Sequence, residues 1–266
     1  MDKHTIVQQL IPLYGEREAG LIVQNLFLDL FDGRQHLKAE EIRILESSVK
    51  RLRAYEPLQY VTGKAFFRDF VLWVAPGVLI PRPETEELVD IAIRLAKSKK
   101  CRHVLDIGTG SGCIALAMKK EMPDMKVTAI DKSGEALSIA RENALGLDLD
   151  VEWLTCDFLD EKFRSELIPP DLIVSNPPYI GREESNTLAP NVLRYEPELA
   201  LFADGDPLVF YRAIAGYGFS LQVPVVCEIN EKWGNETRTC FSDAGYNHVE
   251  IQQDLQGKDR FVIADL

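Results

Sequence analysis

The chain has 266 residues, 46% of them hydrophobic, and a formal net charge of −12. This length allows one large domain and a small one, and the apolar content suits a sizeable core. No apolar run approaches the ~20 residues of a membrane span, and the N-terminus lacks the pattern of a secretory signal. We therefore expect a cytoplasmic protein.

Three further features of the composition argue against a disulfide framework, a metal site and a nucleic-acid-binding protein. The five cysteines are odd in number and contain no C-x-x-C pair, so we expect no disulfide framework. The four histidines are scattered, so no metal site is expected. Residues 1–64 hold nine basic and nine acidic residues, and the remainder therefore carries the whole net charge of −12. An acidic surface suits a polyanion poorly, so we expect no stable binding of nucleic acid.

Residues 5–56 are predicted to be helical. Apolar residues such as Ile6, Leu10 and Leu13 recur at spacings of three and four, which is the period of an amphipathic helix. We expect a bundle of three to five helices that forms an N-terminal domain over residues 1–62. Its apolar stripes suit the bundle's own core, and the alternative is a surface that docks a macromolecular substrate.

A linker and a long helix are predicted next. Over residues 63–80, apolar side chains alternate on both sides of Arg68-Asp69, which is typical of two short strands joined by a turn. Pro83 and the glutamates that follow it are typical of a helix start. We expect that helix to run to about Lys97 and to open a second domain over residues 81–266.

Apolar segments then alternate with helical ones. They span residues 103–107, 127–131, 151–155, 171–175 and 223–229. This alternation predicts an α/β domain with helices on both faces of a parallel sheet. Two further segments, 248–252 and 260–264, flank the turn residues Gly257-Lys258-Asp259 and are expected to pair at one edge. The expected sheet is seven-stranded and mostly parallel.

Residues 181–206 show little periodicity. We interpret them as a long loop, which inside a compact domain is usually functional. Because this segment follows a candidate site directly, we expect it to form a wall or lid of a substrate cleft. Glu196-Pro197 is expected to brace the loop and not to contact the substrate.

A glycine-rich turn joins the first of these strands to a helix. Glycines let the backbone approach a ligand closely, but nicotinamide and flavin proteins share such turns. Cys113 stands where the dinucleotide fingerprint has Gly or Ala, and Asp106 would repel a pyrophosphate. A cationic sulfonium with an amino-acid tail would tolerate that carboxylate. The residues expected to bind such a cofactor are Asp106, Gly108, Thr109, Gly110, Ser111 and Gly112.

Acidic residues follow the next two strands. Asp131 ends the strand 127–131, where a carboxylate can accept both ribose hydroxyls. Asp157 lies just past the strand 151–155 and can accept from an adenine amino group, while Phe158 packs on the ring. Taken singly, Asp157 is typical of a loop or a helix cap and Phe158 of a core. Their shared position at the carboxyl ends of consecutive strands favours the cofactor.

The stretch Asn176-Pro177-Pro178-Tyr179 follows the strand 171–175. Two prolines fix the backbone and leave its carbonyls free to accept hydrogen bonds. The Asn176 side-chain oxygen and the Pro177 carbonyl suit the two N–H groups of a planar nitrogen, and Tyr179 offers a stacking face. The alternative is a turn that ends the strand. We expect Asn176, Pro177 and Tyr179 to be catalytic, all four residues to bind substrate, and Asn176 also to contact the cofactor.

Together these motifs resemble the release factor glutamine methyltransferases, the HemK/PrmC-like family of class I S-adenosylmethionine-dependent methyltransferases. Further blocks carry the resemblance, at residues 57–63, 79–89, 174–180 and 195–197. It extends from about residue 50 to the C-terminus. Nucleic-acid base methyltransferases share the Asn-Pro-Pro-Tyr motif, but the block at residues 79–89 is not expected in them.

The resemblance implies a Rossmann-like methyltransferase fold and a protein substrate. The family transfers a methyl group from S-adenosylmethionine, leaving S-adenosylhomocysteine, to the glutamine side-chain nitrogen (N5) of the Gly-Gly-Gln motif in class 1 peptide-chain release factors. We expect a monomeric enzyme of translation termination. Three alternatives stay open: a methyltransferase for adenine or guanine amino groups in nucleic acid, one for a small molecule or another protein, and a non-catalytic cofactor-binding adaptor.

One position departs from the family pattern. The family usually has Glu, an apolar residue and Gly near residue 228, whereas this chain has Glu228-Ile229-Asn230. The missing glycine leaves the geometry of this loop open, although it touches neither the glycine-rich turn nor the Asn-Pro-Pro-Tyr motif.

Overall fold

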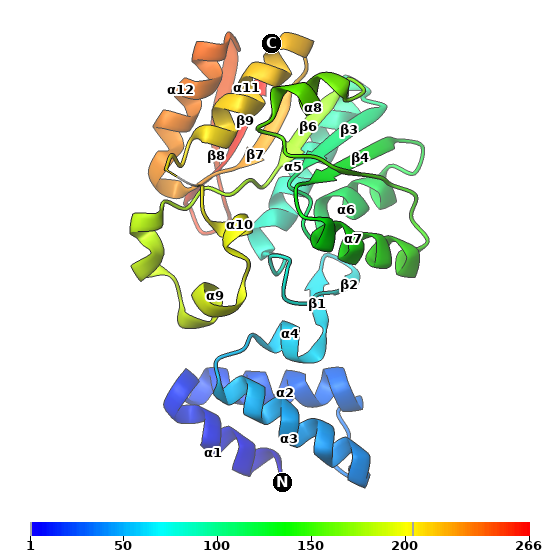
Figure 1. Ribbon diagram of the computed structural model, residues 1–266, viewed down its shortest axis with the longest axis vertical. Coiled ribbons are helices and arrows are strands. Elements are labelled where there is room, and N and C mark those ends of the chain that lie inside the picture. Colours follow the sequence, from blue (N-terminus) through cyan, green and yellow to red (C-terminus); the bar gives the residue numbers. More distant parts are fainter. Residues whose placement is uncertain (1, 204) are drawn as a thin grey trace.

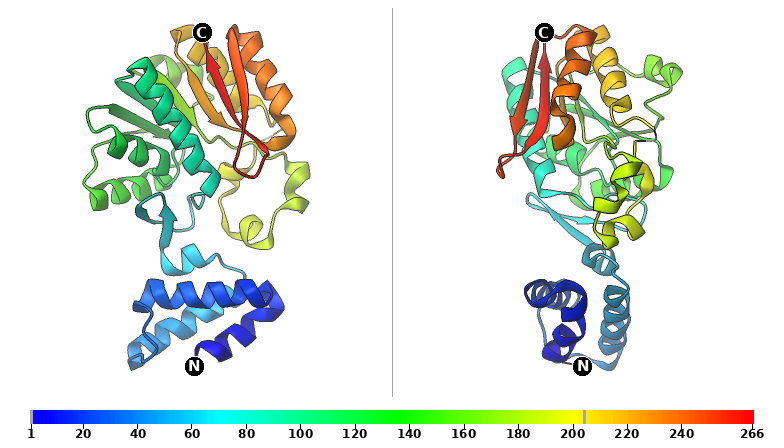
Figure 2. Two further views of the ribbon diagram at one scale, coloured as in Figure 1. Left: turned by 180° about the vertical axis from the view of Figure 1, so that it is seen from behind. Right: turned by 90° about the vertical axis from the view of Figure 1, so that its left-hand side faces the viewer.

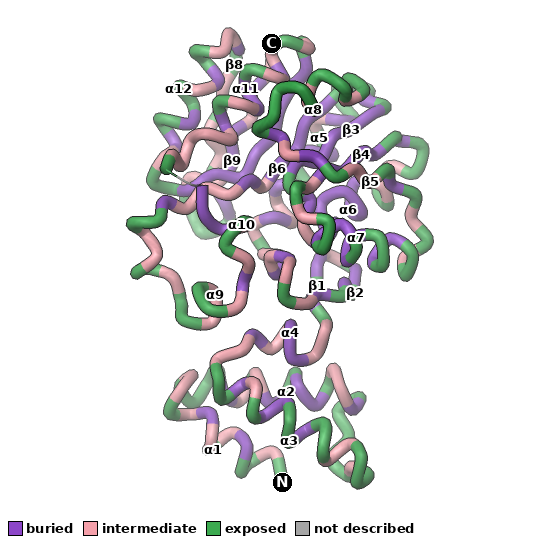
Figure 3. The backbone as a smooth tube through the Cα atoms, viewed as in Figure 1, coloured by how far each residue is buried: buried purple, intermediate pink, exposed green. Residues whose placement is uncertain are grey.

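The computed structural model describes residues 2–203 and 205–266 and is elongated, with its N-terminal helices at one end and its C-terminus at the other (Figure 1). These helices are α1 (Lys3–Tyr14), α2 (Glu16–Phe31), α3 (Ala39–Arg53) and the short α4 (Leu58–Thr62). The apolar stripes predicted from the sequence, including Ile6, Leu10 and Val23, are buried in a core that these helices share. Buried positions recur along each helix in Figure 3.

A two-stranded hairpin connects the helices to the rest of the chain. Strands β1 (Lys64–Phe67) and β2 (Phe70–Trp73) are antiparallel, with Phe67 opposite Phe70, and Arg68 takes a left-handed φ of 53° at the turn. Asn143 fixes the hairpin to the larger part of the protein, because its side chain accepts from the Trp73 amide at 2.7 Å and donates to the Trp73 carbonyl at 3.0 Å.

A seven-stranded sheet forms the centre of the described chain, in the order β5-β4-β3-β6-β7-β9-β8. Its strands are β3 (His103–Ile107), β4 (Lys126–Asp131), β5 (Glu152–Thr155), β6 (Leu172–Ser175), β7 (Val225–Glu228), β8 (His248–Gln253) and β9 (Asp259–Asp265). Strands β3 to β7 are parallel, whereas β9 is antiparallel to both β7 and β8. The predicted seven-stranded, mostly parallel sheet is confirmed.

Helices cover both faces of this sheet (Figure 2). One apolar core joins the sheet to α5 (Pro83–Lys99), α6 (Cys113–Glu121) and α7 (Gly134–Leu147). A second core joins the opposite face to α11 (Val209–Leu221) and α12 (Gly234–Ala244), and the short α8 (Glu161–Glu166) lies beside α11. None of the helices in the described part of the chain has the length and apolar content needed to cross a membrane.

The segment expected to be an irregular loop contains three short helical pieces. They are η1 (Arg182–Thr187), α9 (Pro190–Tyr195) and α10 (Glu198–Leu201). The two ends of the segment are tied together, because the Ile180 amide donates to the Leu201 carbonyl and the Ala203 amide donates to the Ile180 carbonyl, both at 3.1 Å. Pieces of four to six residues are too short to produce a periodic apolar pattern, which explains the difference from the sequence prediction.

The loop after β7 does not need the glycine that the family usually has. Asn230 has a φ of −72°, which any residue can adopt. Its side chain accepts from the Lys232 amide at 3.0 Å and caps the short helix η2 (Glu231–Trp233). Asparagine therefore stabilises this loop directly.

Candidate active site

A cavity of about 190 Å³ lies at the carboxyl ends of β3 to β6. Its inner wall comes from the glycine-rich turn and the ends of these strands, and its outer wall comes from residues 77–79 and from residues 197, 199 and 200. A larger groove of about 780 Å³ between α8 and α11 is more open and contains none of the predicted site residues. The predicted residues that line the smaller cavity are Gly108, Gly110, Asp131, Asp157, Phe158, Asn176 and Pro178.

The glycine-rich turn uses its glycines for two purposes. Gly108 and Gly110 have positive φ values of 74° and 55° and line the cavity. A Cβ atom on either would meet no other atom within 4 Å, so these two residues leave space for a ligand. Gly112 also has a positive φ, of 85°, but its Cβ would lie 3.0 Å from Cη2 of Trp153 and 3.2 Å from Cβ of Ala140. Gly112 therefore serves close packing.

Asp131 ends β4 beside this turn. Its Oδ2 accepts from the Gly110 amide at 2.9 Å and its Oδ1 accepts from the Ser133 amide at 2.8 Å. These bonds fix the plane of the carboxylate, and the carboxylate keeps capacity to accept from a further donor. Burial raises the pKa of Asp131, and the backbone amides oppose that rise. Two oriented acceptors at this position suit a vicinal diol.

Asp157 and Phe158 form the neighbouring part of the wall. Asp157 pairs with Lys132 at 2.8 Å and accepts from the Leu159 amide at 3.1 Å. The Lys132 ammonium is the main cause that lowers the pKa of Asp157, so this carboxyl is ionised at neutral pH. The buried Phe158 ring packs edge-to-face on Tyr217, with 5.6 Å between ring centroids. Both predicted residues therefore lie where a ligand in the cavity would meet them.

Four predicted cofactor residues do not line this cavity, namely Asp106, Thr109, Ser111 and Gly112. The Asp106 side chain is buried, and its Oδ2 accepts from the Thr109 hydroxyl at 2.6 Å and from the Ala115 amide at 3.2 Å. Burial raises its pKa to about 7. Asp106 Oδ1 is a buried acceptor without a donor among the described residues. Direct contacts of these four residues with a cofactor stay predictions.

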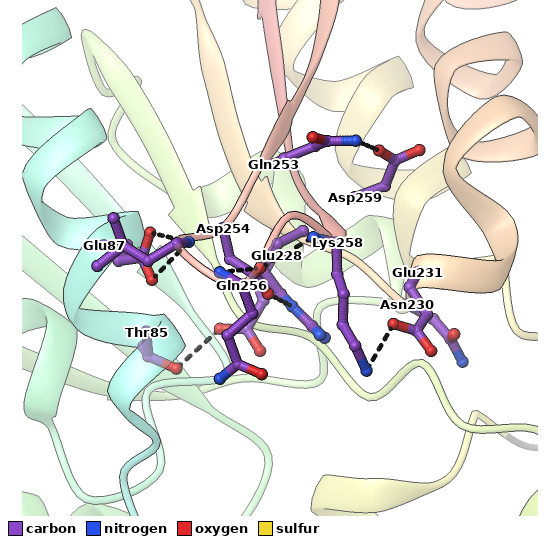
Figure 4. Close-up of polar contacts among 12 residues, drawn as sticks. Thr85, Glu87, Glu228, Asn230, Glu231, Gln253, Asp254, Gln256, Lys258 and Asp259 are labelled. Atoms are coloured by element: carbon purple, nitrogen blue, oxygen red, sulfur yellow. Dashed lines mark hydrogen bonds and ion pairs between the residues drawn. The ribbon is translucent and has the colours of Figure 1, made fainter.

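Asn176 is held by a chain of hydrogen bonds between segments that are far apart in the sequence. Its Nδ2 donates to the Thr85 hydroxyl at 3.1 Å. Thr85 in turn donates to Oε2 of Glu228 at 2.8 Å (Figure 4). Tyr179 donates to the other carboxylate oxygen, Oε1, at 3.1 Å. Glu228 and Thr85 are both 2% exposed. One buried carboxylate at the end of β7 therefore connects Asn176 with Tyr179.

The rest of the Asn-Pro-Pro-Tyr motif has mixed exposure. Pro177 is buried, whereas Pro178 and Tyr179 are partly exposed. Pro178 lines the cavity, but Pro177 and Tyr179 are not part of its lining. Burial and the Glu228 carboxylate raise the pKa of Tyr179, so the phenol stays neutral and acts as a donor. The structure thus brings Asn176 to the cavity, and it ties the Tyr179 hydroxyl to the carboxylate that also accepts from Thr85.

The outer wall is braced by Glu196, as its sequence position suggested. Its carboxylate accepts from the Ile80 amide at 3.2 Å and pairs with Arg82 at 2.6 Å. The Glu196 side chain is 1% exposed. This interaction joins the two outer segments of the cavity wall, and it gives Arg82 a function beyond the start of α5.

Thr85 and Glu228 were missed as site residues. Thr85 lies in the first turn of α5, where a threonine suggests only the start of a helix. Glu228 carried a usable signal, because it ends the otherwise apolar strand Val225–Glu228. A charged residue in a strand that is buried throughout needs a partner, and the sequence does not say which.

Residues 89–222 match the methyltransferase small domain family. The chain is 44% identical over 244 residues to the release factor glutamine methyltransferase of Bacteroides thetaiotaomicron, covering 90% of this chain and 86% of that protein. It is 49% identical over 237 residues to the enzyme of the same name from Streptococcus pneumoniae, covering 85% and 81%.

Solved structures support the fold at lower identity. The hMettl16 catalytic domain matches with a TM-score of 0.55 and 17% identity, over 88% of this chain and 84% of that one. A methyltransferase from Pyrococcus furiosus matches with a TM-score of 0.52 and 16% identity, over 85% and 98%. Because its curated relatives are similar over most of their length and its motifs meet at one cavity, this chain belongs to the release factor glutamine methyltransferase family.

Proposed function

We propose that this protein methylates the side-chain amide nitrogen of the glutamine in the Gly-Gly-Gln motif of class 1 peptide-chain release factors. The observation that carries the proposal is the position of Asn176. It lies at the wall of the cofactor cavity, and its amide is held by Thr85 so that Oδ1 has no donor among residues 2–203 and 205–266. An acceptor at that junction suits an incoming N–H group. Two similar proteins, from Bacteroides thetaiotaomicron and Streptococcus pneumoniae, are release factor glutamine methyltransferases, which supports this substrate.

The methyl donor of the family is S-adenosylmethionine, which when bound supplies an electrophilic methyl group on a sulfonium. The residues present fit this molecule. The Asp131 carboxylate has free lone pairs for the ribose hydroxyls, and Gly108 and Gly110 leave open space at the turn. Asp157 and Phe158 would hold the adenine from the adjacent wall.

The chain's own residues then have to make a poor nucleophile react. A carboxamide nitrogen delocalises its lone pair into its carbonyl, so the site must orient it. Asn176 Oδ1 would accept one N–H and the Pro177 carbonyl the other, and both bonds strengthen as positive charge develops on the nitrogen. Tyr179 would orient the flat amide by stacking. The proton is lost only once the methyl is transferring, so no strong base is required beforehand.

The domain roles belong to the same proposal. We assign residues 1–62 to a helical bundle that docks the release factor, residues 63–80 to a linker, and residues 81–266 to the methyltransferase domain. The separate apolar core of the N-terminal helices supports this division. The protein would act in the cytoplasm as a monomer. Size-exclusion chromatography with light scattering tests the last point, and a dimer mass would contradict it.

The decisive experiment is methyl transfer to a purified bacterial class 1 release factor. The protein is incubated with labelled S-adenosylmethionine, and the modified peptide is mapped by mass spectrometry. We expect one methyl group on the glutamine of Gly-Gly-Gln, and no label on a release factor in which glutamate replaces that glutamine. Label in RNA or DNA substrates, with none in the release factor, would favour the nucleic-acid alternative and overturn the proposal.

A further inference from the structure

An amide side chain that positions a substrate must present a defined end to it. The side chain of Asn176 has an acceptor oxygen and a donor nitrogen of nearly equal size, and a rotation of 180° about its last bond exchanges them. With Oδ1 toward the substrate, the site accepts an N–H group. With Nδ2 toward the substrate, two donors face each other and the site fails. Something in the protein must therefore select one orientation.

The neighbours of Asn176 supply that selection. Thr85 has one hydroxyl proton, and Glu228 Oε2 lies 2.8 Å from its oxygen. An ionised carboxylate can only accept, so the Thr85 proton points to Glu228 and the Thr85 oxygen offers lone pairs to Asn176. The Tyr179 hydroxyl donates to the other oxygen of the same carboxylate. The direction of every bond in the chain thus follows from one negative charge.

We propose that Thr85 and Glu228 are positioning residues that fix the orientation of the Asn176 amide for methyl transfer. This inference rests on the proposed function for its kinetic test. Neither side chain lines the cofactor cavity, so their loss should act on turnover and leave binding of the methyl donor unchanged. The three residues come from α5, the end of β6 and the end of β7, and the Asn176–Thr85 pair is 91 residues apart in sequence.

The kinetic test compares Thr85→Val with Thr85→Ser. The valine variant keeps the shape of the side chain and removes its hydroxyl, and we expect kcat to fall about 10- to 100-fold because the amide loses its orientation. The dissociation constant of S-adenosylmethionine, measured calorimetrically, should stay within about threefold. Serine keeps the hydroxyl and should restore most of the turnover. A valine variant with near-normal kcat, or a serine variant as impaired as valine, would overturn the inference.

A matched control is available in α12. Thr237 is fully buried, and its hydroxyl has no hydrogen-bond partner among the described residues. Thr237→Val makes the same chemical change outside the chain and should leave kcat unchanged. If Thr85→Val fails to fold, Glu228→Gln tests the same inference, since a glutamine of equal size cannot accept from both Thr85 and Tyr179. Normal turnover in that variant would contradict the assigned role of the charge.

A readout without substrate separates this inference from the proposed function. In protein labelled with ¹⁵N-asparagine, the side-chain N–H signals of Asn176 are identified by their absence in Asn176→Asp. We expect slow hydrogen exchange of these signals in wild type and in Thr85→Ser, and fast exchange in Thr85→Val. If wild type does not methylate the release factor, the proposed function fails. The exchange pattern tests the orienting role of Thr85 independently of methyl transfer. Equal exchange rates in wild type, Thr85→Ser and Thr85→Val would refute that role.

Discussion

The candidate active site has two parts that are built differently. The donor side would hold the methyl donor, and the acceptor side would hold the amide substrate. The donor side is local: the glycine-rich turn and Asp131 belong to consecutive strands, and backbone amides fix the carboxylate. The acceptor side depends on side chains from distant segments, because Asn176 donates to Thr85, and Thr85 donates to Glu228, which is 143 residues farther along the chain. The Asp131 carboxylate is fixed by neighbouring backbone, whereas the Asn176 amide depends on two further side chains and loses its partners if either is replaced.

The largest expected effect is on the acceptor side. Replacing Asn176 with alanine removes an acceptor that strengthens in the transition state, and kcat should fall about 10²-fold or more. The dissociation constant of S-adenosylmethionine should change by no more than about threefold. Single-turnover kinetics and calorimetry check the two quantities. Turnover near the wild-type value would refute the assignment of Asn176 as the amide acceptor.

The corresponding change on the donor side should weaken binding of S-adenosylmethionine and leave kcat nearly unchanged. In Asp131→Ala the ribose hydroxyls lose a carboxylate acceptor, which should weaken S-adenosylmethionine binding about 10- to 100-fold. At saturating donor, kcat should stay close to wild type. Asp131→Asn keeps one acceptor oxygen and should lie between the two. An unchanged affinity in the alanine variant would show that the diol binds elsewhere.

The pH dependence sharpens the role attributed to Glu228. Burial is the main cause that raises the pKa of this carboxyl, so it takes up a proton at a higher pH than an ordinary glutamic acid. A protonated Glu228 can donate to Thr85 and reverse the chain, so kcat should fall about tenfold per pH unit below that pKa and be constant above it. The groups that face this carboxyl are Thr85 and Glu84 of α5, Cys113 of α6, Tyr179, Tyr211 of α11 and Arg260 of β9.

Among these groups, Arg260 favours the ionised carboxylate and Glu84 opposes it. A kcat–pH profile for wild type and for Glu228→Gln measures the effect. The acid limb should be present in the first protein and absent from the second. An identical acid limb in both would assign the titration to another group.

The smallest expected effect is the difference between alanine substitutions at two glycines of the glycine-rich turn. Gly108 and Gly112 both have positive φ, so alanine is strained at either position. Only at Gly112 would the new Cβ contact Trp153 and Ala140, and we expect Gly112→Ala to cost about 1–3 kcal/mol more in unfolding free energy than Gly108→Ala. Gly108→Ala should instead weaken donor binding. Thermal unfolding and calorimetry test the pair, and equal losses of stability would refute the packing role.

Local patterns predicted the strands around the cavity better than the contacts that hold Asn176. The strand before the glycine-rich turn was expected at residues 103–107 and is His103–Ile107, and Asp131 lies at the end of β4 as expected. These features follow from apolar periodicity and from turn chemistry, which a short window contains. The fold prediction succeeded for the same reason, since strand–helix alternation leaves few topologies.

What the sequence did not predict depends on contacts between distant residues. The sequence around Thr85 does not indicate which residue its hydroxyl bonds. The helical pieces between residues 182 and 201 are too short to give a periodic apolar pattern. The absence of the family's usual glycine near residue 228 left the geometry of this loop open, and Asn230 adopts an ordinary φ and caps η2. In each case the deciding information is three-dimensional.

The Glu196 brace has a consequence for how the cavity can open. Its carboxylate joins the Ile80 amide and the Arg82 guanidinium to the segment that carries the opposite outer wall. Any opening that separates these walls must break an ion pair whose carboxylate is 1% exposed. Such an opening would leave a buried carboxylate without its partners, so the brace that shapes the cavity also restrains its two outer walls.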